Sequence, residues 1–300
     1  MKKALIINTS NLGDVISGIY VSNPLLKAGY EVSYLIKDTF SSLFSDTDYI
    51  EYTTKSIPSS FFDLTIDLTS DNGSRKIIKK IKSKNKIGRN KNFFSKIKHS
   101  YVYTKQVNKY TKSNHIVYNF KPVLELLNIE PINNTYLNTS INKKPGNEVC
   151  IHIGAKSRIR CIPLNLIIDI CNFFKSKNIP VRLIGHETDI AEKILEKTNG
   201  FPVFKFSSLK NTKKWLYNAR LVIASDSGIF HLASALKTKT IGIYGPNTYN
   251  RSGSINHNTS YIELDLPCRP CNQNIKCPYD IKCLYNIKFE DVEKVIMQNI

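Results

Sequence analysis

The 300-residue sequence lacks any long apolar run. Its apolar stretches are far shorter than the roughly 18–20 residues that a membrane-spanning helix requires, so we expect no transmembrane segment. The apolar stretch at residues 4–7, which follows a basic start, is also too short for the core of a signal peptide. The sequence therefore favours a cytoplasmic protein whose contact with a membrane is peripheral.

Glycine-rich nucleotide motifs are also missing. No G-x-G-x-x-G follows any apolar run that could form a strand. Those glycines provide the tight turn and close approach that dinucleotide binding needs, so their absence argues against a nicotinamide-dependent oxidoreductase. No repeat with the period of a solenoid is present either, which excludes that class of architecture.

Acidic residues are scarce. The chain has 24 Asp and Glu against 43 Lys and Arg, and residues 75–121 contain fifteen basic residues, interleaved with aromatics, and no acid. A formal net charge of +19 predicts anionic partners: phosphate-bearing ligands, anionic lipid or nucleic acid. The basic residues are densest at Lys79, Lys80, Lys82, Lys84, Lys86, Arg89 and Lys91.

Short apolar runs alternate with helical patterns in both halves of the chain. Residues 4–8, 32–36 and 64–68 are predicted strands, with a helix at 15–26. The pattern restarts after the polar stretch 142–148, with predicted strands at 149–153, 181–184, 221–224 and 240–244. We therefore predict an α/β protein of two doubly wound domains, residues 1–143 and 148–300, that bind ligands at the carboxyl ends of their strands.

The segment ASDSGIFHLASALKTKTIGIYGP, residues 224–246, carries the most informative motif. Asp226 and Ser227 fall at a predicted helix start, where either side chain can cap, and Gly228 lets a ligand approach the backbone. Free amides and the helix dipole favour an anion there, with His231 one turn further on. We favour a diphosphate site over the alternative, an ordinary N-cap with a packed histidine.

Two further strand-to-loop segments carry charged side chains. HIGAKSRIRCIP, residues 152–163, places Lys156, Arg158 and Arg160 before a helix that begins at proline, where cations would suit a leaving diphosphate. LIGHETD, residues 183–189, places Glu187 after a glycine turn, where a carboxylate could bind ribose hydroxyls. Solvated surface charge and a helix N-terminal acid are the alternatives.

Together with SNLGDVI at residues 10–16, these motifs resemble glycosyltransferase family 9, the bacterial heptosyltransferases of lipopolysaccharide core synthesis. The matching segments are RCIP, GHE, DSGIFHLASA and IYGP, in the family's order and spacing. The resemblance implies a GT-B fold, in which two Rossmann-like domains with parallel sheets face a cleft. It also implies metal-independent, inverting transfer of heptose from ADP-heptose.

The same resemblance assigns roles to individual residues. Asp14 would be the general base, and Gly13 beside it would contact the acceptor. The donor would be bound by Lys156, Arg160, Glu187, Asp226, Ser227, Gly228 and His231. One departure concerns the family's K-x-W-P, which is R-C-I-P here: Arg160 keeps the charge with another geometry, and the aromatic is lost.

Asp14 follows the first predicted strand, at the start of a helix. Inverting transfer needs a base that takes the proton from the attacking hydroxyl. The base should lie on the acceptor domain, and Asp14 does so in this assignment. The alternative is an acid placed to interact with a helix dipole.

The basic segment suits an anionic glycolipid acceptor and the inner face of the bacterial inner membrane. We assign Lys79, Lys80, Lys82 and Arg89 to acceptor binding on this ground. A single-stranded nucleic acid is the rival partner, because basic residues with aromatics bind it. That rival leaves DSGIFHLASA unexplained, so we predict no nucleic-acid partner.

Four of the seven cysteines lie close together: Cys268, Cys271, Cys277 and Cys283. Their number and C-x-x-C spacing can close a tetrahedral zinc or iron site, although reduced thiols are an equal alternative. Such a metal would be structural, and no cofactor is expected for catalysis. An odd total of cysteines also argues against a disulfide framework.

Our functional hypothesis is an inverting glycosyltransferase that moves heptose from ADP-heptose to a lipopolysaccharide-core or related acceptor. Another sugar nucleotide or a protein acceptor on the same fold is the first alternative. A non-catalytic protein that binds anionic glycans is the second, and Asp14 argues against it. A sugar-nucleotide epimerase would need more acids or histidines than the motifs supply.

Overall fold

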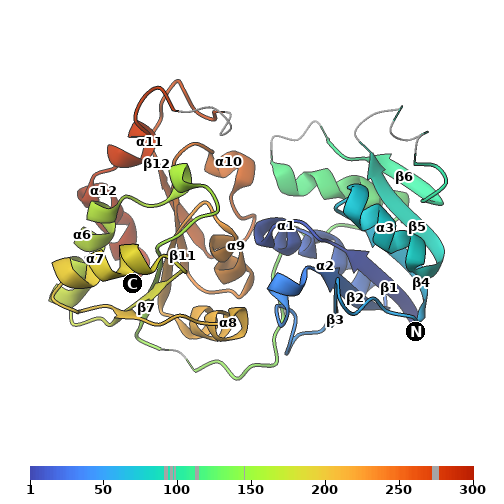
Figure 1. The fold of residues 1–300 in the computed structure, drawn as a ribbon, viewed down its shortest axis with the longest axis horizontal. Helices are drawn as coiled ribbons and strands as arrows, with labels where there is room; N and C mark the ends of the chain where they lie inside the picture. The colour runs from blue at the N-terminus through green and yellow to red at the C-terminus, as the bar shows by residue number, and fades with distance from the viewer. Residues whose placement is uncertain (91–93, 95–96, 98, 112–114, 145, 272–276) are drawn as a thin grey trace. The chain divides into compact units, whose positions relative to one another are not determined.

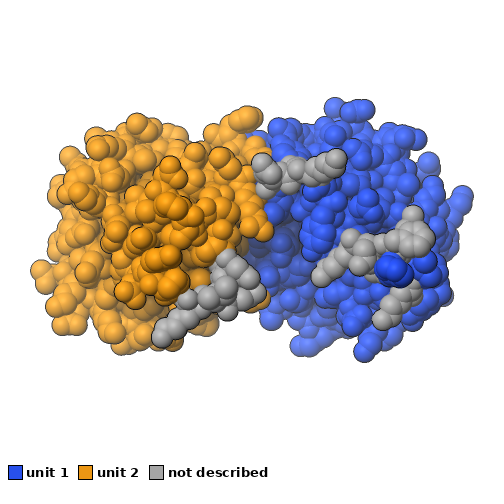
Figure 2. All heavy atoms as spheres, turned by 90° about the horizontal axis from the view of Figure 1, so that it is seen from above, with its two compact units in different colours: residues 1–140 blue, residues 141–300 orange. Residues whose placement is uncertain are grey.

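The computed structural model describes residues 1–300 except 91–93, 95–96, 98, 112–114, 145 and 272–276. Lys91 of the basic segment therefore lies outside the described residues. The chain divides into two compact units, Met1–Ser140 and Ile141–Ile300, which Figure 2 colours separately. We refer to them as unit 1 and unit 2. That unit 1 binds the acceptor and unit 2 the donor stays a prediction.

Unit 1 contains, in its described part, a parallel sheet of six strands in the order β3-β2-β1-β4-β5-β6 (Figure 1). The chain runs outward from β1 to β3, returns to β4 beside β1, and continues outward to β6. β1 and β4 therefore flank the point where strand order reverses, which is where open α/β sheets bind ligands. The strands are β1 (Lys2–Ile7), β2 (Tyr30–Ile36), β3 (Ile50–Thr53), β4 (Phe61–Asp67), β5 (Lys82–Asn90) and β6 (Lys105–Asn108).

Helices cover the sheet of unit 1. Leu5 and Ile7 of β1 pack with Ile78 of α3. Successive side chains of a strand point to opposite faces, so the buried Ala4 and Ile6 lie on the other face of the sheet. The described helices are α1 (Leu12–Ser17), α2 (Ile19–Lys27), α3 (Asn72–Lys80) and α5 (Lys121–Leu126), with 3₁₀ turns at Asp38–Phe40 and Ile116–Phe120.

The helix predicted at residues 15–26 is in fact two helices that meet at Gly18. A Cβ atom at Gly18 would come within 3.0 Å of Nδ2 of Asn8 and 3.1 Å of a Leu68 methyl group. This glycine therefore lets the helix junction pack directly on the ends of β1 and β4. α1 begins at Leu12, earlier than predicted, and Asp14 lies in its first turn.

Unit 2 repeats the arrangement, with a parallel sheet in the order β12-β11-β10-β7-β8-β9 among its described residues (Figure 1). Here β7 and β10 flank the reversal of strand order. The carboxyl ends of these two strands are therefore the expected ligand edge. The strands are β7 (Val149–His152), β8 (Val181–Ile184), β9 (Val203–Phe204), β10 (Leu221–Ser225), β11 (Thr240–Tyr244) and β12 (Thr259–Glu263).

The core of unit 2 is mostly aliphatic. Ile151, Ile223 and Ile241 from three strands pack with Phe174 of α6 and Val292 of α12, all fully buried. β10 is buried along its whole length, as its continuous apolar run predicted. The helices are α6 (Leu164–Ser176), α7 (Thr188–Lys197), α8 (Leu209–Asn218), α9 (Gly228–Ala235), α10 (Tyr249–Ser252), α11 (Lys282–Tyr285) and α12 (Phe289–Met297), with a 3₁₀ turn at Arg158–Arg160.

Both units are thus Rossmann-like, and the predicted α/β class is confirmed. In the part of the chain that the structure describes, no helix is both long and apolar enough to cross a lipid bilayer.

Candidate active site

Asp14 lies in the first turn of α1, directly after the loop that leaves β1. Its carboxylate accepts a long hydrogen bond, 3.4 Å, from the backbone amide of Asn11. The side chain of Asn8, at the end of β1, donates to the Asp14 backbone carbonyl at 3.0 Å. The acid therefore takes part in the helix start, as the alternative interpretation proposed, and is also held at the edge of the sheet where strand order reverses.

A cavity of about 260 Å³ lies beside Asp14 within unit 1. Its lining comes from the carboxyl ends of β1, β4, β5 and β6, from α1 and from the 3₁₀ turn Ile116–Phe120, which are far apart in sequence. One carboxylate and two cations therefore share a pocket large enough for a sugar-sized group. The lining residues are Asn8, Ser10, Asp14, Ser17, Leu68, Thr69, Arg89, Lys109, Tyr110, Ile116, Asn119 and Phe120.

Arg89, predicted as part of a basic surface, is instead 5% exposed. Its guanidinium donates to the backbone carbonyls of Leu68 at 2.6 Å and Lys109 at 2.9 Å, and lies 4.4 Å from the ring centre of Phe120. Burial lowers the pKa of Arg89 to about 10, with the Asp67 and Asp14 carboxylates acting in the opposite direction. Arg89 remains charged at neutral pH and holds the strand ends around the cavity.

The loop after β4 is organised by a buried carboxylate. Asp67 is fully buried, and burial raises its pKa. It accepts hydrogen bonds from the Ser70 amide at 2.7 Å and from the hydroxyls of Ser74 and Tyr103, each at 2.8 Å. Thr69 in this loop accepts from the backbone amide of Thr9 at 2.8 Å, so the loops after β1 and β4 are joined beside the cavity.

Lys79, Lys80 and Lys82 do not reach this cavity. The first two end α3, and Lys82 begins β5, at the amino end of the sheet. Lys82 and Arg89 are seven residues apart along one extended strand, which corresponds to about 23 Å. The structure thus separates the residues that the sequence assigned together to acceptor binding.

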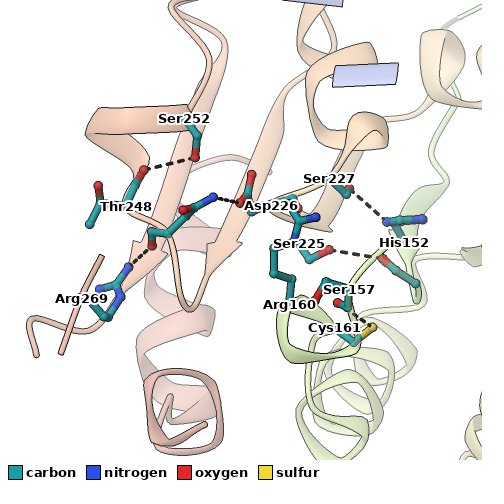
Figure 3. A network of polar contacts seen from close by, with 12 residues as sticks. His152, Ser157, Arg160, Cys161, Ser225, Asp226, Ser227, Thr248, Ser252 and Arg269 are labelled. Carbon is teal, nitrogen blue, oxygen red and sulfur yellow. Dashed lines mark hydrogen bonds and ion pairs between the residues drawn. The ribbon is translucent and has the colours of Figure 1, made fainter. Parts of the chain in front are cut away.

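In unit 2, Arg160 and Asp226 form an ion pair beside α9 (Figure 3). Nη1 of Arg160 lies 3.4 Å from Oδ2 of Asp226 and 3.2 Å from its backbone oxygen. The side-chain amide of Asn247 donates to the same carboxylate oxygen at 2.7 Å. Nε of Arg160 is buried and has no acceptor within the described part of the chain. The pair therefore orients a guanidinium that retains donor capacity.

Arg269 supports this arrangement from the cysteine-rich segment (Figure 3). It donates to the backbone oxygen of Asn247 at 2.5 Å and to the carboxylate of Glu263 at 2.8 Å, and also binds the backbone oxygen of Gly245. The side chain is 4% exposed. Arg269 thus fixes the turn that follows β11, and through Asn247 it fixes Asp226.

Ser227 is the N-cap residue of α9, but its side chain makes no capping hydrogen bond. Ser227 is therefore not the ordinary N-cap that the alternative interpretation of this motif supposed. Its hydroxyl instead lies 3.2 Å from Nδ1 of His152, the last residue of β7 (Figure 3). Burial, with His186 nearby, lowers the pKa of His152 to about 4, so this imidazole is neutral at pH 7.

Glu187 lies over the ends of β7 and β8. Its carboxylate accepts from the His186 amide at 2.8 Å. A Cβ atom at Gly154 or Gly185 would come within 2.1 Å or 2.5 Å of that carboxylate, so both positions require glycine for this placement. Gly185 also has a φ of +155°.

The remaining predicted donor residues lie on the same edge of unit 2. Lys156 is exposed in the loop after β7, and Gly228 begins α9. His231 follows within the first turns of α9, its ring 5.3 Å from that of Phe230. The predicted donor residues thus surround the carboxyl ends of β7, β8 and β10. Whether they bind a donor stays a prediction.

The four cysteines of the tail line one cavity of about 230 Å³ in unit 2, together with Arg269 and Ile281. The neighbouring thiols of Cys277, Cys268 and Cys271 add to the effect of burial in raising the pKa of Cys283. Within the described residues, which omit 272–276, no three His, Cys, Asp or Glu side chains are grouped closely enough to hold a metal ion. The arrangement as it stands does not fit a metal site.

Several residues that shape these sites carry little signal in the sequence. His152 opened a quoted motif but carries no obvious signal, because its partner is 75 residues away. Asn247 directly follows the G-P turn, which was a usable signal. Lys109 lies in the segment interpreted by its charge, and Arg269 lies between two cysteines interpreted by their spacing as metal ligands.

Known proteins match this chain in sequence over part of its length and in fold over nearly all of it. Residues 163–280 match the family model described as Glycosyltransferase family 9 (heptosyltransferase). A lipooligosaccharide heptosyltransferase 2 of Campylobacter jejuni is 41% identical over 59 residues, 19% of this chain. A lipopolysaccharide heptosyltransferase 1 of Pseudomonas aeruginosa is 36% identical over 64 residues, 21% of this chain. The matched segments span only 18% of each of these relatives.

The fold match extends over nearly the whole chain. The structure of Escherichia coli heptosyltransferase WaaC with ADP superposes with a TM-score of 0.78, covering 99% of this chain and 100% of that one, at 15% sequence identity. At this identity the likeness shows the fold alone. It establishes the predicted GT-B class of two Rossmann-like units.

The family match lies within the carboxyl-terminal unit. Over residues 163–280 it confirms the resemblance to glycosyltransferase family 9 that the motifs predicted. GHE, DSGIFHLASA and IYGP lie inside the matched range, whereas SNLGDVI with Asp14 lies outside it.

Proposed function

We propose that this protein is an inverting glycosyltransferase that moves heptose from ADP-heptose to a hydroxyl of a lipopolysaccharide-core or related acceptor. The observation that carries the proposal lies at the edge of unit 2 where β7 and β10 end. There the Arg160 guanidinium has an Nε without an acceptor in the described part of the chain, and the neighbouring helix α9 has no side-chain cap. That edge lies partly within the family 9 domain. WaaC, of similar fold, has been solved with ADP and with ADP-2-deoxy-2-fluoro heptose.

In the donor half of the proposal, the diphosphate occupies the N-terminus of α9. The amides of Gly228 and its successors and the dipole of an eight-residue helix favour a negative charge there. Arg160 and Lys156 add positive charge, which stabilises the diphosphate most as it leaves. The Glu187 carboxylate is the acceptor for the ribose hydroxyls.

In the acceptor half, the cavity beside Asp14 holds the sugar that is to be extended. Its hydroxyl oxygen attacks the anomeric carbon of the heptose while the bond from that carbon to the diphosphate oxygen breaks. Asp14 takes the proton of the hydroxyl, and ADP leaves with the electron pair of the broken bond. Attack opposite the leaving group inverts the anomeric centre.

Anionic acceptors suit the charges of unit 1. Arg89 and Lys109 line the cavity, and Lys109 donates from Nζ to the Thr69 backbone oxygen at 3.1 Å. At the amino end of the sheet, Lys79, Lys80 and Lys82 are exposed, and Nζ of Lys79 lies 4.5 Å from the ring centre of the exposed Tyr101. We propose that this second surface contacts an anionic membrane while the cavity holds the reacting sugar.

The structural zinc or iron ion that the sequence allows at Cys268, Cys271, Cys277 and Cys283 stays a prediction apart from this proposal, and no catalytic step depends on it. The four thiols line one cavity, which favours a metal site. Within the described residues, however, they are not grouped closely enough to hold an ion. Elemental analysis of protein purified without chelator tests it. About one zinc or iron per chain supports the site, and less than about a tenth overturns it.

Thermal-shift measurements with nucleotides test the main proposal. A ligand at 100 times its dissociation constant stabilises a protein by about 2.7 kcal/mol, which shifts Tm by several degrees. We expect ADP and ADP-heptose to raise Tm and UDP and GDP to leave it unchanged. A response to UDP or GDP alone would assign another donor, and no response to any nucleotide would overturn the proposal.

Transfer is then measured directly, with ADP-heptose and a deacylated lipopolysaccharide-core acceptor. Release of ADP that depends on the acceptor supports glycosyl transfer. Nucleotide binding without any acceptor-dependent turnover would instead favour the non-catalytic alternative.

A further inference from the structure

The start of α9 lacks the usual side-chain cap. The first amides of any α-helix have no partner inside the helix, and a serine at the N-cap usually accepts from the second or third of them. Ser227 occupies that position with extended backbone, φ −149° and ψ 166°, yet makes no such bond. The amides of Gly228, Ile229 and Phe230 are therefore left without a side-chain cap.

The Ser227 hydroxyl has His152 as its partner instead. Nδ1 of His152 lies 3.2 Å from the Ser227 hydroxyl, so that hydroxyl is engaged toward β7 (Figure 3). A second contact joins the same two strands, because the Ser225 hydroxyl donates to the Gly154 backbone oxygen at 3.3 Å. The ends of β7 and β10 are thus tied together on both sides of Asp226.

We propose that His152 is a positioning residue which holds the Ser227 hydroxyl away from the first turn of α9 and so keeps the helix amides available to a diphosphate. The inference rests on the donor site of the proposed function. Arg160 gives that site a second feature: its side chain is 22% exposed beside Asp226, and its Nε has no acceptor in the described part of the chain. His152 itself touches neither the sugar nor the reacting atoms in this scheme.

This role has a distinctive consequence. Without His152, Ser227 is free to turn and cap α9, so the hydroxyl competes with the diphosphate for the amides. Removal of His152 therefore weakens ADP binding, and further removal of the Ser227 hydroxyl partly restores it. A histidine that merely supported the fold would give a double variant at least as defective as the single one.

Isothermal titration with ADP tests the inference on the full chain. We expect His152→Ala to weaken ADP binding about fivefold or more, the scale of one hydrogen bond. His152→Asn, whose amide can occupy the place of Nδ1, should stay within about twofold of wild type. The double variant His152→Ala/Ser227→Ala should bind ADP more tightly than His152→Ala alone.

His257→Ala, an exposed histidine of the same unit, is the matched control and should bind ADP as wild type does. If His152→Ala unfolds too readily for titration, His152→Leu replaces it, because leucine fills the space without a polar atom. ADP affinity is then compared between His152→Leu and His152→Leu/Ser227→Ala. The inference is overturned if the alanine and leucine variants bind like wild type, or if the double variant binds no better than the single one. A wild-type chain that does not bind ADP would overturn the donor site itself.

Discussion

The guanidinium of Arg160 lies 3.4 Å from the carboxylate of Asp226, which is itself 5% exposed and also accepts from Asn247. An acid beside a proposed phosphate site needs explanation, because two anions repel. The ion pair neutralises Asp226 and turns it into a support for Arg160. Asp226 therefore acts through Arg160 in the proposed mechanism, and its carboxylate does not meet the diphosphate unpaired.

Replacing Arg160 should impair both donor binding and turnover. We expect Arg160→Met to lower kcat/KM by about 10²-fold, because the leaving diphosphate loses a charge-assisted donor and Asp226 is left without its cation. Arg160→Lys should retain part of the activity, since it keeps the charge but cannot contact Asp226 and phosphate in the same fork geometry. Steady-state kinetics with ADP-heptose measures both.

Arg158→Met is the matched control for Arg160, because Arg158 lies in the same 3₁₀ turn but is exposed. It should cause a clearly smaller loss. Equal losses for the two arginines would show that the loop contributes only general positive charge.

Asp14 is expected to be essential for transfer and dispensable for folding. Asp14→Asn and Asp14→Ala should lower kcat by about 10³-fold, since general base catalysis typically contributes 10²–10⁴-fold. Thermal shifts by ADP should stay unchanged, because Asp14 belongs to unit 1. Glu31→Gln at the amino end of β2 serves as the control. A loss below about tenfold would contradict the base assignment.

The stability of the chain should depend on pH through His152. Its folded-state pKa of about 4 is below the ordinary value of 6.5. Between these pH values the unfolded chain binds a proton that the folded chain does not, so the unfolding free energy falls as pH falls from 6.5 toward 4. His152→Asn removes this titrating group. Its Tm, measured by circular dichroism, should therefore fall less between pH 6.5 and pH 4 than that of the wild type. Parallel profiles for the two proteins would argue against a His152 that is neutral in the folded chain.

The basic surface at the amino end of β5 should govern lipid binding alone. We expect Lys79→Gln/Lys80→Gln/Lys82→Gln to reduce sedimentation with phosphatidylserine-containing vesicles, by about 1 kcal/mol per lysine at low salt. ADP binding should not change, because these lysines belong to unit 1. Wild-type binding should also fall with added salt. Undiminished sedimentation of the triple variant would exclude this surface as the contact.

Local features of the sequence predicted much of the fold. Continuous apolar runs such as residues 221–224 indicated buried parallel strands, because strands covered on both faces expose no polar face. The restart of the alternation near residue 148 indicated a second unit, and DSGIFHLASA indicated its family. The break at Gly18 was not predicted, because it arises from the close approach of Asn8 and Leu68.

The lysine-rich segment shows where composition is insufficient. Charge density alone grouped Lys82 with Arg89, although one strand carries them to opposite ends of a sheet. Arg89 is buried because three neighbouring strand and helix ends present carbonyls to it, and those partners lie as far away as Asn119 in sequence. No local pattern distinguishes such an arginine from an exposed one.

The sequence by itself determined the alternation of strands and helices, the family of residues 163–280 and the chemical types gathered at the strand ends, because these depend on residues near one another in the chain. Only the tertiary structure decided which side chains meet. His152 ends β7 and Ser227 follows β10, so the two residues lie on adjacent strand ends although they are 75 residues apart in the chain. Their contact exists because strand order reverses between β7 and β10, which places these two strands side by side.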